Sequence, residues 1–131
     1  MTAKPLRKGF KQMLAEANAV IETIDVQHAL KLVDDPSVQF VDIRDGAEIA
    51  ASGMLPGAVQ ASRGMLEFLA DPESPIHKKE LSSSKKLVLY CASGGRSTLA
   101  TKTLYDMGLT NACHIAGGFT AWNAAGGPVQ K

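Results

Sequence analysis

Apolar residues along the chain form short strand-like runs separated by segments with helical spacing. Residues 38–43 and 86–90 are compact apolar runs, and the second is almost continuously apolar, as expected for a central parallel strand covered on both faces. We predict shorter strands at Ile24, at residues 58–60 and at residues 111–115. Because helical segments separate the strands, the sequence predicts an α/β fold with a mostly parallel central sheet of about five strands flanked by helices on both faces.

The predicted helices cover residues 10–22, 26–33, 47–52, 63–70 and 96–107, with a further short helix that carries Trp122. Helix 10–22 precedes the first strand. We therefore predict that residues 1–22 form a helical arm packed on a domain formed by residues 23–131; alternatively, this helix binds a partner.

The predicted helix 96–107 has an expected inward face and a clear C-terminal signal. We expect its buried side chains to be Leu99, Thr103, Leu104 and Met107. Gly108 stands where a left-handed residue ends many helices. This helix is separated from the strand 86–90 only by a short loop, and it ends near residue 107.

Composition narrows the classes of partner. The chain has 131 residues, of which 45% are hydrophobic and 21% charged, the balance of one ordinary globular domain. Its formal net charge of +1 provides no field to recruit nucleic acid or an anionic membrane. The sequence has neither an apolar stretch of the roughly 18–20 residues that span a bilayer nor a leader with a continuous apolar core. We expect no nucleic-acid or membrane partner, and a cytoplasmic location.

The segment YCASGGRS, residues 90–97, carries the candidate chemistry. The strand before it delivers Cys91 to its carboxyl end, where ligands bind in open α/β sheets. The residues after Cys91 are small or glycine, so their backbone N–H groups can turn inward, and a helix begins near Arg96. The unpaired amides and the dipole at a helix start favour an anion at this point.

The same features act on the cysteine itself. A thiolate surrounded by N–H donors, near an arginine and a helix start, should have a lowered pKa. We therefore expect Cys91 to be a nucleophile and the loop to bind an anionic substrate through Ala92, Ser93, Gly94, Gly95, Arg96 and Ser97. Arg96 either donates hydrogen bonds to substrate oxyanions or faces outward and only braces the loop.

Four sequence elements together resemble the rhodanese family. Residues 41–44 (VDIR) are similar to its D-x-R element, and residues 53–58 (GMLPGA) resemble its G-H-I-P-G-A element, with Met54 where histidine is common. Residues 91–97 match the C-x-x-G-x-R-S active loop, and residues 117–122 (GGFTAW) resemble the closing G-G-x-x-A-W element. The elements occur in family order and span most of the chain.

This resemblance implies a thiosulfate sulfurtransferase-like enzyme. Cys91 would take sulfane sulfur from a small anionic donor such as thiosulfate and hold it as a persulfide. It would then pass the sulfur to cyanide or to a thiol, including a protein thiol. No metal or organic cofactor is implied, and we expect a monomer or a weak homodimer. In several thiosulfate-using members basic residues stand in the loop where this chain has Ala92 and Ser93.

Three further residues are candidates for the site. Asp42 and Arg44 sit at the carboxyl end of the strand 38–43, at the same sheet edge as Cys91, where they either support the loops or form a purely structural ion pair. Arg63 follows the turn after a neighbouring strand and either contacts substrate or is a surface residue.

Two other functions of the same fold stay open. One is a binding or redox-sensor module, in which Cys91 is loaded without turnover. The other is a phosphatase or arsenate reductase. Phosphatases of this fold use C-x5-R, whereas Cys91 and Arg96 give C-x4-R, a narrower loop that suits a sulfur substituent better than a phosphoryl group.

The remaining cysteine, histidines and tryptophan have simpler interpretations. Cys113 begins a predicted strand at the edge opposite Cys91, so we expect a structural thiol and no disulfide. His28, His77 and His114 have no ligand-like spacing, so no metal site is predicted. Trp122 is expected to anchor the last helix in the core.

Overall fold

The computed structural model describes residues 3–131 and contains a five-stranded, all-parallel sheet in the order β1-β5-β4-β2-β3. The strands are β1 (Glu22–Ile24), β2 (Val38–Asp42), β3 (Val59–Gln60), β4 (Lys86–Tyr90) and β5 (Ala112–Ile115). This confirms the predicted α/β fold, including the central position of β4. Because all strands run the same way, the residues that follow them meet at one edge of the sheet.

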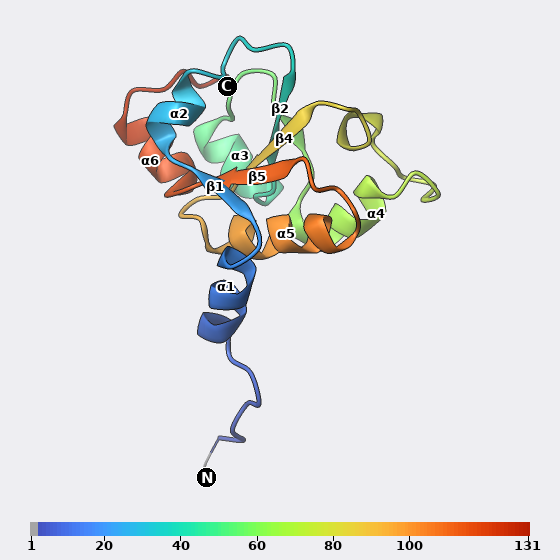
Figure 1. Cartoon of the computed structure of the whole chain (residues 1–131). Coiled ribbons are helices and arrows are strands. Elements are labelled where there is room, and N and C mark those ends of the chain that lie inside the picture. Colours follow the sequence, from blue (N-terminus) through green and yellow to red (C-terminus); the bar gives the residue numbers. More distant parts are fainter. Residues whose placement is uncertain (1–2) are drawn as a thin grey trace.

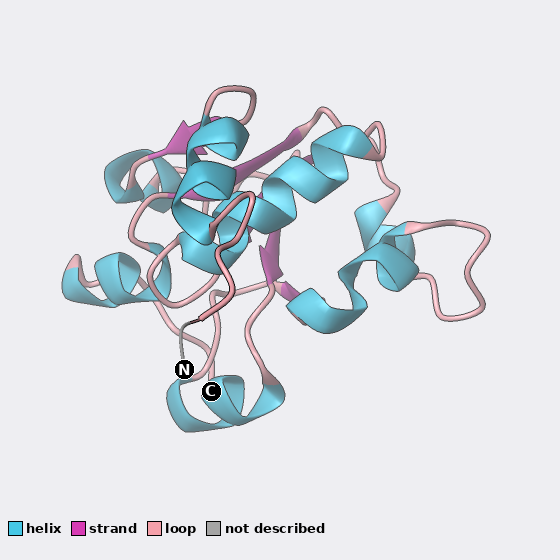
Figure 2. Cartoon of the chain, turned by 90° about the horizontal axis from the view of Figure 1, so that it is seen from below, coloured by secondary structure: helices cyan, strands magenta, loops and turns pink. Residues whose placement is uncertain are grey.

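Helices cover both faces of the sheet (Figure 1). The α-helices are α1 (Phe10–Asn18), α2 (Val26–Leu30), α3 (Gly46–Ser52), α4 (Leu66–Ala70), α5 (Gly95–Asp106) and α6 (Gly118–Ala124), with 3-10 turns η1 (Arg63–Met65) and η2 (Lys79–Leu81). Figure 2 looks onto the layer that contains α1 and α5, with the strands behind it. None of the helices within residues 3–131 has the length and apolar character needed to cross a membrane.

The alternation of side chains along β4 divides the core in two. Leu87 and Leu89 point toward the cluster that lies under α4 and α5, whereas Val88 and Tyr90 point toward the cluster under α2 and α6. All four are fully buried, as expected for a central parallel strand. Trp122 is also fully buried, and its ring packs edge-on against Phe40, which confirms the expected core anchor.

The N-terminal helix is shorter than predicted. It ends at Asn18 rather than near residue 22, because Glu22–Ile24 pair with β5 as an edge strand. Of its residues only Ala17 is buried, and α1 lies beside α5, while Phe10 is 65% exposed. Met1 and Thr2 of the predicted arm lie outside the described residues.

The inward face of α5 also differs from the prediction. Met107 lies just beyond the helix and is exposed, and Leu99 and Thr103 are only partly buried. The buried side chains of α5 are Ser97, Thr98, Ala100, Thr101 and Leu104. Three of these five carry hydroxyls, and those of Thr98 and Thr101 are satisfied by the carbonyls of Gly94 and Ser97. Gly108 does adopt a left-handed conformation, with φ of 101°.

Candidate active site

The loop between β4 and α5 wraps around the sulfur of Cys91. The backbone N–H groups of Gly94 and Ser97 donate to Sγ at 3.1 and 3.4 Å, and the Ser97 hydroxyl lies 3.6 Å from it. Cys91 is fully buried, whereas Ser93 and Gly95 above it are exposed and Ala92 is partly buried. Of the predicted loop residues, Gly94 and Ser97 therefore contact the sulfur directly.

Gly94 makes this geometry possible. Its φ of 113° lies in a region that residues with a Cβ rarely adopt, and it is the residue directly before α5. The turn aims the Gly94 amide back at Sγ, while the first-turn amides of α5 have no helical carbonyl to bond. The loop therefore directs backbone N–H donors at Cys91 Sγ, where they can stabilise a negative charge.

The hydrogen bonds lower the pKa of the Cys91 thiol. Burial of the sulfur raises the pKa, but the Ser97 hydroxyl and the amides of Ser97, Gly94 and Ser93 together outweigh burial. By contrast, burial raises the pKa of Cys113 to about 12, because its neighbours do not compensate. Of the two thiols, Cys91 is the one prepared to ionise.

The start of α6 holds the cysteine loop from behind. The amide of Phe119 donates to the Cys91 carbonyl at 2.8 Å, and the amide of Thr120 donates to the Ala92 carbonyl at 3.0 Å. Gly118, with φ of 56°, lies so close that a Cβ there would overlap the Cys91 carbonyl oxygen. This glycine, in the 117–122 element that resembles the family, therefore allows α6 to approach closely enough for its amides to bind the carbonyls of the active loop.

Arg96 is occupied by an acidic partner. Its Nη1 and Nη2 donate to the two carboxylate oxygens of Glu48 on α3 at 2.8 and 2.9 Å. Glu48 also accepts from the amide of Asp45, in a capping box that starts α3. Of the two roles predicted for Arg96, this arrangement corresponds to bracing the loop rather than to binding a substrate oxyanion. Nothing in the sequence indicated Glu48 as its partner.

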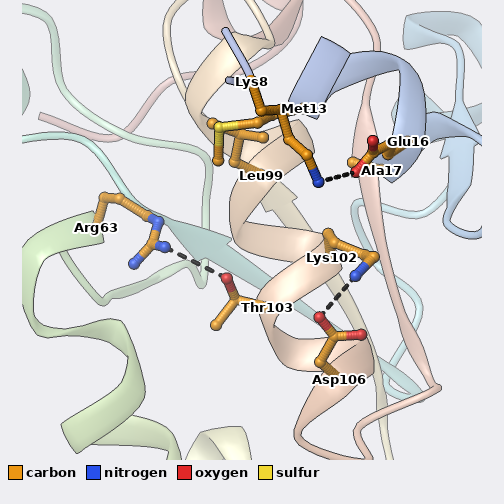
Figure 3. A pocket seen from close by; sticks show the side chains of 9 residues that line it. All are labelled: Lys8, Met13, Glu16, Ala17, Arg63, Leu99, Lys102, Thr103 and Asp106. Carbon is orange, nitrogen blue, oxygen red and sulfur yellow. Dashed lines mark hydrogen bonds and ion pairs between the residues drawn. The ribbon is translucent and has the colours of Figure 1, made fainter. Parts of the chain in front are cut away.

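Arg63 lies along α5, away from the hydrogen bonds around Cys91. Its guanidinium pairs with Glu67 at 3.0 Å and reaches Thr103 Oγ1 at 3.3 Å. Figure 3 shows it at the side of a cavity of about 300 Å³ between α1 and α5, which Lys8 and Lys102 also line. Arg63 thus has no hydrogen bond to the loop around Cys91, and its predicted contact with substrate stays a prediction.

Asp42 and Arg44 form a buried, bidentate ion pair at the predicted sheet edge, 2.8 Å between Arg44 Nη2 and Asp42 Oδ2. Arg44 also donates to Ser52 Oγ and to the Gly53 carbonyl, and its guanidinium lies 4.3 Å from the centre of the Phe119 ring. The pair therefore connects the end of β2 with α3 and α6, both of which contact the cysteine loop.

A histidine that the sequence analysis set aside lies behind the sulfur. His114 on β5 is 3% exposed, and its Nδ1 lies 2.9 Å from Ser97 Oγ, the hydroxyl next to Cys91. A polar residue within the apolar strand 112–115 was the only signal that could have marked it. The contact of His114 with Ser97 depends on the register of β5 beside β4, which places His114 under the start of α5.

Neither thiol forms a disulfide. Cys91 and Cys113 are both free, and they belong to the clusters on opposite faces of the sheet. Within residues 3–131 no group of three or more His, Cys, Asp or Glu side chains is arranged to hold a metal ion.

Comparison with known proteins identifies the family. The model of the rhodanese-like domain matches residues 25–125. A sulfurtransferase from Allochromatium vinosum is 35% identical over 76% of this chain and 84% of its own length.

Two solved structures extend the comparison. A protein of unknown function from Rhodopseudomonas palustris, described as a possible tyrosine phosphatase, is 47% identical over 99% of this chain and all of its own, with a TM-score of 0.94. The human single-domain sulfurtransferase is 27% identical over 78% of this chain and 95% of its own, with a TM-score of 0.66.

Proposed function

This chain belongs to the rhodanese-like domain family, and from that premise we propose that it is a sulfurtransferase that carries sulfane sulfur as a persulfide on Cys91. The observation that carries the proposal is the set of hydrogen-bonding groups around one sulfur: two backbone amides that donate to it at 3.1 and 3.4 Å, and a hydroxyl at 3.6 Å. These donors lower the pKa of Cys91 and leave the sulfur as a nucleophile held in an anion-binding loop.

The first displacement loads the cysteine. The Cys91 thiolate attacks the outer sulfur of an anionic donor such as thiosulfate, a new S–S bond forms, and the bond within the donor breaks. The leaving group, sulfite in the case of thiosulfate, departs with the electron pair. The amides that stabilise the thiolate are then positioned to stabilise the terminal sulfur of the persulfide.

The second displacement empties the cysteine. A thiophilic acceptor, cyanide or a thiolate, attacks the outer sulfur, and Cys91 leaves as the thiolate from which the cycle began. No metal or organic cofactor takes part, and a covalent intermediate between two half-reactions gives ping-pong kinetics. Because Cys91 has no exposed surface, the small residues Ala92, Ser93 and Gly95 above it are the part of the loop that must admit the donor.

We propose that the loop binds thiosulfate through hydrogen bonds from uncharged groups. The exposed residues Ser93 and Gly95 are available to its sulfonate oxygens, whereas the charge of Arg96 is already matched by Glu48. The acceptor in this proposal is cyanide or a thiol, including a protein thiol.

A phosphatase activity is the second candidate, because the Rhodopseudomonas palustris protein is described as a possible tyrosine phosphatase. In this chain the count from Cys91 to Arg96 is C-x4-R, and Arg96 is bound to Glu48 rather than free to hold a phosphoryl group. Both features favour sulfur transfer over phosphate chemistry.

Mass spectrometry tests the proposal. The protein is incubated with thiosulfate or with polysulfide, and the mass of the Cys91 peptide is measured before and after addition of cyanide. We expect a gain of one sulfur atom that cyanide removes, no gain in Cys91→Ser, and an unchanged gain in Cys113→Ser, the matched control. No gain with any donor contradicts the proposal.

Turnover separates the alternatives. Repeated formation of thiocyanate supports the enzyme, whereas loading of one sulfur without transfer supports a sensor or binding module. Release of phosphate from an aryl phosphate in wild type but not in Cys91→Ser supports the phosphatase.

A further inference from the structure

Hydrogen-bonding groups lead from the buried sulfur of Cys91 through the protein to the edge strand β1. Cys91 Sγ lies 3.6 Å from Ser97 Oγ, and Ser97 Oγ lies 2.9 Å from Nδ1 of His114. On the other side of the ring, Nε2 lies 3.0 Å from the hydroxyl of Thr23, an exposed residue of β1. The Thr98 hydroxyl is a more distant neighbour of Nε2, at 3.5 Å, and its own hydrogen goes to the Gly94 carbonyl at 2.7 Å.

The imidazole in this series is neutral. Burial lowers the pKa of His114 to about 4, and the side chains that face it carry no charge: Ser97 and Thr98 from α5, Thr23 from β1, and Leu89, its partner on β4. The ion pair of Lys86 with Glu22, on the neighbouring strands, lies on the other face of the sheet, because Glu22 is the partner of Cys113 rather than of His114.

A neutral ring carries one N–H, so its two nitrogens have opposite roles. If Nε2 holds the hydrogen, Nδ1 accepts the hydrogen of Ser97, and Ser97 Oγ is left to accept from the Cys91 thiol. If Nδ1 holds the hydrogen, it donates to Ser97 Oγ, and Nε2 accepts from Thr23. The Ser97 hydrogen is then available to the Cys91 thiolate, in competition with the Gly94 carbonyl at 3.2 Å.

Each tautomer therefore fits one protonation state of Cys91. We propose that Ser97, His114 and Thr23 form a positioning relay of reversible polarity, which keeps the Cys91 sulfur hydrogen-bonded both as a thiol and as an anion. The inference rests on the proposed function only in requiring that Cys91 ionise during the reaction.

The change in the relay conserves atoms and charge. When Cys91 ionises, the S–H bond breaks and its electron pair stays on Sγ. Each hydrogen moves one place along: from Cys91 to Ser97, from Ser97 to Nδ1, and from Nε2 to Thr23. Thr23 gives the last proton to water at the surface, so the protein loses one proton in all and nothing is oxidised or reduced.

The tautomer of His114 is directly measurable by NMR, because protonated and unprotonated ring nitrogens give separate resonances in isotope-labelled protein. We expect the hydrogen to move from Nε2 to Nδ1 over the pH range in which Cys91 ionises, and to stay in place in Cys91→Ala. His77 is the internal reference, since its Nδ1 donates to the Leu69 carbonyl at 2.9 Å whatever the state of Cys91. A tautomer that does not change, or that changes equally in Cys91→Ala, overturns the relay.

A variant at the far end of the relay gives an independent test. Thr23→Val removes the hydroxyl that accepts from Nε2 in the thiol state and donates to it in the anionic state. The Thr98 hydroxyl, whose own hydrogen goes to the Gly94 carbonyl, can replace it as an acceptor but not as a donor. The anionic state therefore loses more, and the pKa of Cys91 rises. We expect the pH at which iodoacetamide alkylates Cys91 at half its maximal rate to rise by roughly half to one unit, the equivalent of one ordinary hydrogen bond. Thr23→Ser, which keeps the hydroxyl, should restore the wild-type profile.

These readings do not depend on sulfur transfer. An unchanged alkylation profile in Thr23→Val, or the same shift in Thr23→Ser, overturns the relay even where the protein transfers sulfur. Absence of transfer together with a tautomer that follows Cys91 would contradict the proposed function and leave the relay supported.

Discussion

Arg96 and Glu48, which stand 48 residues apart in the sequence, form a bidentate ion pair beside the active loop, with N–O distances of 2.8 and 2.9 Å. Hydrogen bonding to Arg96, with help from the Asp45 amide, lowers the pKa of Glu48 to about 2, so the carboxylate stays charged. The same pair raises the pKa of Arg96 further above its ordinary value. The arginine of the loop therefore meets an incoming anion with its charge already balanced.

Glu48→Gln should strengthen the use of anionic donors. The neutral amide leaves the Arg96 charge unbalanced, so a donor such as thiosulfate gains a cationic partner at the mouth of the loop. We expect its KM to fall roughly threefold to tenfold, corresponding to about 1 kcal/mol, with little change in kcat. Steady-state kinetics measures this, with Glu67→Gln, which breaks the Arg63 pair instead, as the matched control. An unchanged or higher KM would show that Arg96 acts only as a brace.

The same ion pair predicts a loss of stability in acid. The pKa of Glu48 is lower in the folded protein, about 2, than its ordinary value of 4.5, so its contribution is complete above pH 4.5 and disappears as the pH falls toward 2. Because both side chains are about one-third exposed, solvent screens the pair, and we expect a contribution of only about 1 kcal/mol. Denaturant unfolding of wild type and Glu48→Gln should differ above pH 4.5 and converge below it. A difference that persists at the lowest pH would contradict the assignment.

Gly118→Ala should damage the active loop from behind. A Cβ at Gly118 would overlap the Cys91 carbonyl oxygen, and its φ of 56° is itself strained for alanine. We expect a loss of about 1–3 kcal/mol in the free energy of unfolding and slower persulfide formation in the folded fraction. Gly64→Ala is the control, because nothing lies within 4 Å of the added Cβ there. Equal stability and loading rates for the two variants would show that the close approach has no consequence.

The features that could be predicted from the sequence are local ones. The apolar run 86–90 and the small residues after it were enough to place Cys91 at the carboxyl end of a central strand, before a helix. The position of a strand or helix follows from the periodicity of neighbouring apolar residues, so its prediction needs no knowledge of distant residues.

The features that were missed depend on contacts between distant segments. Glu48 meets Arg96 only because α3 lies beside the loop, and His114 meets Ser97 only through the register of β5 beside β4. The predicted burial of Met107 was wrong because α5 ends at Asp106 and buries three hydroxyl side chains beside Ala100 and Leu104. Local pattern carries no information on such pairings.

Arg44→Met and Asp42→Leu should show that the buried pair supports the loops without taking part in the chemistry. Each single change leaves one buried group without its partner, and we expect a loss of about 3–5 kcal/mol in the free energy of unfolding. The double variant removes both charges and should lose less than the sum of the two single losses.

Denaturant unfolding measures stability, and the rate of persulfide formation per folded molecule measures chemistry. That rate should stay within about twofold of wild type in the double variant, since neither residue hydrogen-bonds to Cys91. A folded double variant with a far lower rate would instead make the pair part of the catalytic machinery, because Arg44 contacts both α3 and Phe119 and so has two routes to the loop.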